Sequence, residues 1–168
     1  ASRSGRVGLD LSHLCWLRGA VVSVVPSDVS DARDASSMFR LGAPAGVLHA
    51  AGVLHDKMIR SMAADAMDAS LTPKAVAAWH VSKTLTHAPL EAYGVFSSIT
   101  STLGNVGQAN YASAYAYLDA LAPSRRRRGT LGSSLQIPAV SGAGMAAATF
   151  DAVPLHAMGA ITLETFAE

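Results

Sequence analysis

Four short apolar runs, rich in β-branched and small residues, punctuate the chain. They occupy residues 19–25, 45–52, 92–97 and 131–137. Continuous apolar runs of this length are typical of strands that are buried on both faces, and the Gly and Pro residues beside them mark turns. The pattern therefore predicts four short buried strands.

Between these runs, the apolar positions recur with helical spacing. Helices are predicted over residues 31–40, 64–87 and 108–124. Ser30 is a candidate N-cap for the first helix, and Pro73 predicts a break or a new helix start near Thr72 in the second. Strands that alternate with helices form βαβ units, so we expect an α/β fold with a parallel sheet covered on both faces.

Folds of this class bind ligands beyond the carboxyl ends of their strands. Asp28, Gly52 and Ser98 fall at these ends in the predicted topology. After Gly142 the pattern becomes loose. That segment suits either a mobile lid over a site or an ordinary helix-turn-helix that closes the domain.

The composition is that of one globular domain, because half of the 168 residues are apolar and 15% are charged. No apolar run is long enough to span a bilayer, and the N-terminal residues do not resemble a signal peptide. The single cysteine, Cys15, lies in an apolar run, which excludes a disulfide framework and favours a reducing compartment. We therefore expect a cytoplasmic protein, with an organelle such as a plastid left open.

The charge pattern argues against a polyanionic partner, because the formal net charge is only +1. The one basic cluster, residues 125–128, follows a predicted helix, where cations suit a solvated C-terminus. A nucleic-acid site would need further basic and aromatic neighbours. His49 and His55 have no cluster of His, Cys or Asp at ligand spacing around them, so we expect packing or surface roles and no metal site.

Three polar residues have the spacing and the chemistry needed to reduce a ketone. Ser98 ends a predicted strand, Tyr111 begins a helix thirteen positions later, and Lys74 lies thirty-seven positions before Tyr111. A phenol is a weak acid at neutral pH, but a nearby ammonium stabilises its phenolate, and a second hydroxyl can hold the carbonyl oxygen. Each residue alone could be a helix tyrosine, a strand-end cap or a solvated lysine, whereas the set favours catalysis.

Several motifs in order resemble the ketoreductase domain of modular polyketide synthases, which belongs to the short-chain dehydrogenase/reductase superfamily. The strongest are Gly-Val-Leu-His-Ala-Ala-Gly-Val at 46–53, Leu-Thr-Pro-Lys at 71–74, Phe-Ser-Ser at 96–98 and Gly-Gln-Ala-Asn-Tyr-Ala at 107–112. The resemblance extends over nearly the whole chain. It implies a Rossmann-like, doubly wound parallel sheet and the reduction by NADPH of a β-ketoacyl thioester held on an acyl carrier protein, in the synthesis of a polyketide or, in a close relative, of a fatty acid.

The resemblance also implies roles for individual residues. Tyr111 would be the general acid, Lys74 would lower its pKa and meet the ribose hydroxyls, and Ser98 would hydrogen-bond the ketone oxygen. The cofactor would be held by residues that match the family's binding positions: Arg3 at the 2′-phosphate, Asp28 beside the adenine and Gly52 near the nicotinamide ribose. Val29 and Ala51, next to two of these residues, are also expected to bind the cofactor.

The chain departs from the family in ways that bear on folding. The glycine-rich pyrophosphate turn, the first strand, most of the second strand and the last strand are not seen. The missing first two strands would lie between the strands at 21–25 and 47–50, leaving two apolar edges unpaired. We therefore expect residues 1–168 to be a partial ketoreductase domain, an internal segment of a longer chain, whose sheet is completed by the rest of the domain or by a neighbouring chain.

Other departures bear on activity. Tyr115 stands where the family usually has Asn, and residues 136–140 replace a tryptophan-containing motif. These differences leave open a non-catalytic structural remnant of a ketoreductase domain. A short-chain dehydrogenase that acts on a free alcohol is less favoured, because such enzymes carry Lys four residues after the tyrosine. Leu54-His55-Asp56 and Leu103 lean toward a B-type β-hydroxy product.

Overall fold

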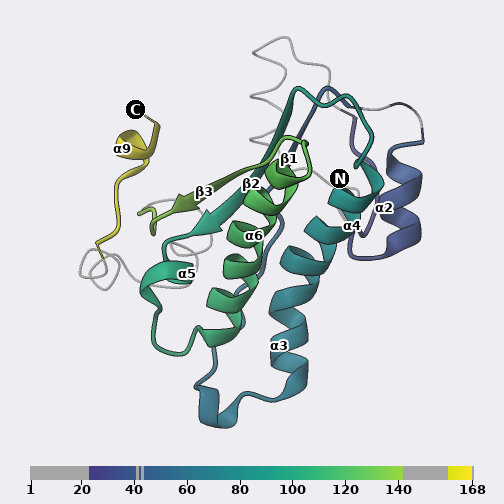
Figure 1. The fold of residues 1–168 in the computed structure, drawn as a ribbon. Helices are drawn as coiled ribbons and strands as arrows, with labels where there is room; N and C mark the ends of the chain where they lie inside the picture. Colours follow the sequence, from purple (N-terminus) through teal and green to yellow (C-terminus); the bar gives the residue numbers. More distant parts are fainter. Residues whose placement is uncertain (1–22, 41, 43, 142–158, 168) are drawn as a thin grey trace.

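A three-stranded parallel sheet forms the centre of the computed structural model, which describes residues 23–40, 42, 44–141 and 159–167 (Figure 1). The strands β1 (Gly46–His49), β2 (Ala92–Ser98) and β3 (Ser133–Ile137) lie in the order β1-β2-β3. The α/β class and three predicted strands are thereby confirmed. The expectation that both faces of these strands are buried was wrong for the described residues. Val47 packs against the core, but its neighbour Leu48 faces the opposite side of the sheet and is 63% exposed, and Leu135 of β3 is 53% exposed. Of the predicted strand at 19–25, residues 19–22 lie outside the described residues, and 23–25 form no strand.

Helices connect the strands, as the alternating pattern predicts. They are α2 (Ala32–Met38), the 3-10 turn η1 (Ile59–Ser61), α3 (Ala64–Leu71), the π-helical turn η2 (Thr72–Val76), α4 (Ala77–Thr84), α5 (Thr100–Leu103), α6 (Ala109–Arg127) and α9 (Leu163–Ala167). The predicted N-cap of α2 was wrong by one residue. Asp31, not Ser30, accepts hydrogen bonds from the Arg33 and Asp34 amides, because its carboxylate reaches the first turn. None of the described helices is long and apolar enough to span a bilayer.

The predicted break near Thr72 takes the form of a widened turn, and the helix continues through it. Pro73 has no N–H, so one intrahelical hydrogen bond is lost there. The Ala77 N–H is shared between the carbonyls of Lys74 and Thr72. Such π-helical turns often occur at functional sites. This one contains Lys74.

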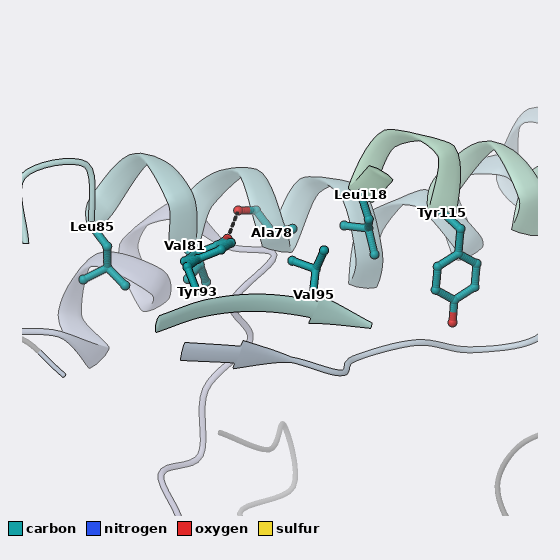
Figure 2. Packing of buried hydrophobic residues seen from close by; sticks show 7 residues of the cluster. All are labelled: Ala78, Val81, Leu85, Tyr93, Val95, Tyr115 and Leu118. Atoms are coloured by element: carbon teal, nitrogen blue, oxygen red, sulfur yellow. Dashed lines mark hydrogen bonds between the residues drawn. The ribbon is translucent and has the colours of Figure 1, made fainter. Parts of the chain in front are cut away.

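The core lies between the sheet and the helices α4 and α6 (Figure 2). Its members come from α4 and its C-cap, from β2 and from α6, and are Ala78, Val81, Leu85, Tyr93, Val95, Tyr115 and Leu118. The Tyr93 hydroxyl donates a 3.2 Å hydrogen bond to the Ala78 carbonyl, so the buried phenol is satisfied. This packing fixes the positions of α4 and α6 against β2.

Helix α6 ends three residues later than predicted, in a Schellman motif. Gly129 has φ of 75°, and the amides of Gly129 and Thr130 donate to the carbonyls of Arg126 and Arg125. The expectation that the basic run lies at a solvated end was wrong for Arg125, which is buried. Its guanidinium stacks 3.9 Å from the Tyr93 ring centroid and donates to Ser82 and to the Leu131 carbonyl.

Candidate active site

Lys74 is completely buried, with 0% of its surface exposed. Its Nζ donates a 2.7 Å hydrogen bond to the carbonyl oxygen of Val53, in the loop that follows β1. Burial lowers the pKa of Lys74 from 10.5 to about 8, and the negative charge of Asp56 partly opposes this shift. Lys74 therefore exchanges its proton closer to neutral pH than an exposed lysine does.

Two tyrosine rings of α6 lie beside this ammonium. Lys74 Nζ is 5.0 Å from the ring centroid of Tyr111 and 5.3 Å from that of Tyr115. The two rings, one helical turn apart, meet edge to face at 4.6 Å and 69°. The structure thus brings together three of the four residues that the sequence places at the reaction centre.

Tyr115 belongs to the hydrophobic core as well as to this cluster. Burial and then the adjacent Tyr111 raise the pKa of Tyr115 well above its ordinary value of 10.0, so its phenol stays neutral at physiological pH. Figure 2 shows its hydroxyl directed toward the sheet side of the packing layer. Tyr115 can donate or accept a hydrogen bond there, but it does not supply a charge.

Gly52 lies close against the lysine side chain. A Cβ atom at this position would lie 3.0 Å from Lys74 Cε, 3.1 Å from Nζ and 3.6 Å from the Tyr115 hydroxyl oxygen. The first two distances are shorter than ordinary van der Waals contact. A glycine at 52 thus leaves room for the lysine, and the bare backbone allows close approach of a ligand.

Ser98 is the last residue of β2. Because β1 and β2 are parallel, it lies at the same end of the sheet as Gly52, which follows β1. Its hydroxyl donates to Thr100 Oγ1 and accepts from the Thr100 amide, each at 3.2 Å. Ser98 therefore caps the turn into α5. Among the described residues, Lys74 lies beside the two tyrosines, whereas the Ser98 hydroxyl is engaged with Thr100.

The expected cofactor residues lie in different parts of the structure. Val29 and Ala51 line one pocket of about 330 Å³, together with apolar side chains that include Phe39 and Val81. Asp28 begins the turn into α2, where its carboxylate accepts from the Ser30 amide and hydroxyl. Arg3 lies outside the described residues.

Sequence reasoning missed two polar residues that hold the start of α6. Asn110 is fully buried, and its Nδ2 donates to the carbonyls of His55 and Ala66 and to Ser70 Oγ. Gln108 donates to the Asp56 carboxylate at 2.9 Å. The one signal was the presence of two amide side chains, Gln108 and Asn110, within three residues of Tyr111. These bonds tie the loop after β1 and α3 to the turn that presents the tyrosine.

Comparison with known proteins identifies the family, because the KR domain matches residues 2–142. The chain belongs to the KR domain family. KR domains are the ketoreductases of polyketide synthases, and they bind a nicotinamide cofactor. The predicted family and the Rossmann-like fold class are confirmed.

Relatives of this KR domain are much longer than the chain. Polyketide synthase GfsA of Streptomyces halstedii is 43% identical over 122 residues, which are 70% of this chain and 2% of that protein. Hybrid PKS-NRPS synthetase pvhA of Talaromyces variabilis is 39% identical over 149 residues, which are 85% of this chain and 4% of the relative. The chain thus spans a few per cent of the length of these relatives.

Solved ketoreductase structures share the fold of this chain and are also longer than it. A ketoreductase domain from the bacillaene assembly line superposes with a TM-score of 0.84 at 27% identity, covering 96% of this chain and 43% of that one. The first ketoreductase of the tylosin PKS gives a TM-score of 0.82 at 27% identity and covers 94% and 35%. The described fold therefore corresponds to less than half of a solved ketoreductase chain.

Proposed function

We propose that this chain supplies the acid catalyst for NADPH-dependent reduction of a β-ketoacyl thioester, held on an acyl carrier protein, to the β-hydroxyacyl thioester. The observation that carries the proposal is the buried Lys74 ammonium beside the Tyr111 ring. We further propose that residues 1–168 act as an internal segment of a longer polypeptide, in which the rest of the domain or a neighbouring chain completes the sheet.

Each catalytic residue has a defined role in this proposal. Tyr111 donates its phenolic proton to the ketone oxygen as negative charge develops there. Lys74 stabilises the phenolate that remains, because a positive charge held a few ångströms away in a buried site acts strongly. Ser98 would donate its hydroxyl proton to the same oxygen after releasing Thr100.

The residues present fit a nicotinamide cofactor. The pocket lined by Val29 and Ala51 has apolar walls suited to a flat aromatic base, and Gly52 leaves room for Lys74 to lie against its backbone. Asp28 and Arg3 keep the adenine and 2′-phosphate roles that the family implies, and Lys74 would hold the ribose hydroxyls. When bound, NADPH supplies the hydride.

The direct test is oxidation of NADPH by a β-ketoacyl thioester mimic, measured on the longer polypeptide that carries this chain. Tyr111→Phe should lower turnover by about 10²- to 10⁴-fold while NADPH still binds. Tyr117→Phe is the matched control, since Tyr117 lies on the same helix with its side chain exposed. A Tyr111→Phe variant that turns over at the unsubstituted rate would remove Tyr111 from the mechanism.

A second candidate function, a non-catalytic remnant, is favoured by Tyr115. This residue replaces the family's Asn and is a neutral core phenol only 6% exposed. A phenol and an amide differ in reach and in the number of protons they donate, so a proton relay built for Asn would be altered. NADPH binding without turnover is the result expected of the remnant.

Tyr115→Asn separates an impaired enzyme from a remnant. If the amide restores the relay, turnover rises although the loss of core packing costs about 3 kcal/mol of folding free energy. Turnover and the free energy of unfolding are measured together on the same preparation. Destabilisation with no gain in turnover supports the remnant.

A further inference from the structure

His49, at the end of β1, contacts the backbone of Lys74. Its Nε2 lies 3.1 Å from the Lys74 carbonyl oxygen, and the histidine is buried. A carbonyl oxygen only accepts hydrogen bonds, so Nε2 carries the proton and donates. Burial lowers the pKa of His49. The hydrogen bond to the Lys74 carbonyl partly opposes this shift and the lysine charge adds to it, so the net direction favours the neutral imidazole as donor.

The carbonyl that His49 binds lies in the π-helical turn. That oxygen also accepts from Ala77, whose single N–H is shared with the Thr72 carbonyl. A shared N–H leaves the turn with weaker backbone support than a regular helix has. The imidazole therefore adds a side-chain donor to the backbone carbonyl of the residue that carries the ammonium.

The other end of Lys74 is fixed by the same short segment of chain. Val53 accepts the Nζ hydrogen bond, and Gly52 lies against Cε and Nζ. Residues 49–53 thus contact the lysine at its backbone, along its stem and at its charge. We call His49, Gly52 and Val53 the lysine clamp.

We propose that His49 is a positioning residue: through the lysine clamp it sets where the Lys74 ammonium lies relative to Tyr111. The backbone hydrogen bond fixes the register of the π-helical turn, and the turn directs the side chain toward the two tyrosine rings. The activity arm of the test rests on the proposed function. The lysine titration does not.

The groups around the ammonium define what a displacement would change. The negative charge of Asp56 raises the pKa of Lys74. Tyr111 and Tyr115 lie beside the Lys74 ammonium on α6. Moving Nζ alters its distance to all three and its burial. A changed Lys74 pKa is therefore a direct report of displacement, independent of catalysis.

The experiment compares His49→Phe, which keeps a ring but removes the donor, with His49→Gln, whose amide can replace Nε2–H. Turnover at saturating NADPH, the KM for the thioester mimic and the melting temperature are measured on the full polypeptide. We expect His49→Phe to lower kcat about tenfold with little change in KM, and His49→Gln to recover most of it. His87→Phe, at an exposed histidine after α4, is the control.

Lys74 is titrated in parallel by NMR of 13C-labelled lysine, assigned with a Lys74→Arg variant. The pKa of Lys74 should shift in His49→Phe and return in His49→Gln. Gly52→Ala is a second, independent variant, because its Cβ would push on Cε from the other side, and the backbone at Gly52 has no positive φ. Gly52→Ala should also shift the pKa of Lys74, and it replaces His49→Phe as the test if that variant does not fold.

The outcomes are distinct. A Lys74 titration unchanged in a folded His49→Phe variant, or in Gly52→Ala where His49→Phe does not fold, overturns the lysine clamp. A kcat of folded His49→Phe within twofold of that of the unsubstituted protein also overturns it. If the unsubstituted protein shows no reductase activity, the proposed function fails and the titration alone decides the clamp. A lower melting temperature with unchanged kcat and titration would make His49 merely structural.

Discussion

Lys74 carries the main energetic conflict at the level of single residues. A buried ammonium loses hydration, and one carbonyl and two aromatic faces replace it only in part. The resulting fall in pKa to about 8 measures how strongly the folded state disfavours the charge. The site thus sacrifices stability to keep a cation beside Tyr111.

This conflict predicts how stability depends on pH. The folded-state pKa of Lys74, about 8, lies below its ordinary value of 10.5, so the unfolded chain keeps this proton to higher pH. The unsubstituted protein should therefore gain stability relative to Lys74→Met as pH rises from about 8 to 10.5. Below pH 8, the difference in free energy of unfolding between the two proteins should not change with pH.

The measurement is denaturant unfolding of both proteins across that window. Lys83→Met, which removes an exposed lysine stacked on Trp79, is the control for the loss of a lysine. Lys74→Met and unsubstituted curves that run parallel through the window would show that burial does not depress the lysine pKa.

Among the elements, apolar patterning was enough for β1, β2, β3 and α6, because each is a regular element bounded by turn residues. It was not enough for features that depend on partners distant in sequence. Arg125 was assigned to a solvated helix end, but Ser82 and Tyr93 arrive from other elements to bury it. Pro73 marked the irregular turn but not its π-helical form.

The candidate site divides in the same way. Spacing was enough to place Lys74 beside Tyr111, since each lies at a fixed position of a helix packed on one sheet. His49 and Asn110 were missed because their main acceptors are backbone carbonyls. Every residue has a backbone carbonyl, so the sequence does not indicate which carbonyl a polar side chain will bind.

The junction of α6 with β3 predicts a steric effect at Gly132. A Cβ there would lie 2.8 Å from the Ala122 carbonyl oxygen and 3.1 Å from Arg125 Cβ. Gly132→Ala should therefore cost about 1–3 kcal/mol of unfolding free energy. Gly46→Ala is the control, because its new Cβ would meet nothing closer than 3.4 Å. Equal stabilities of the two variants would show that the junction is loose.

For the whole molecule, the two outer strands of the sheet each have an edge that no other strand covers within the described residues, and the β1 edge is the more apolar in its surroundings. β1 pairs only with β2 there, and Leu48 is 63% exposed. Unpaired apolar edges favour association with another strand. This edge is where the proposed longer polypeptide would complete the sheet.

The isolated 168-residue chain should accordingly lack a cooperative thermal transition as a monomer, whereas the same segment within the longer polypeptide should melt cooperatively. Calorimetry combined with sedimentation tests this expectation. A monomer of the isolated chain that melts in one sharp step would show that these residues need no completing strands.

The central claim is that Lys74 acts through Tyr111. It is tested most directly by the rate of NADPH oxidation, at saturating NADPH, of the double variant Tyr111→Phe/Lys74→Met against each single variant. If the two residues work as one unit, the double variant turns over no more slowly than Tyr111→Phe alone. Losses that multiply in the double variant would show that the lysine contributes independently of the tyrosine, and would contradict the mechanism.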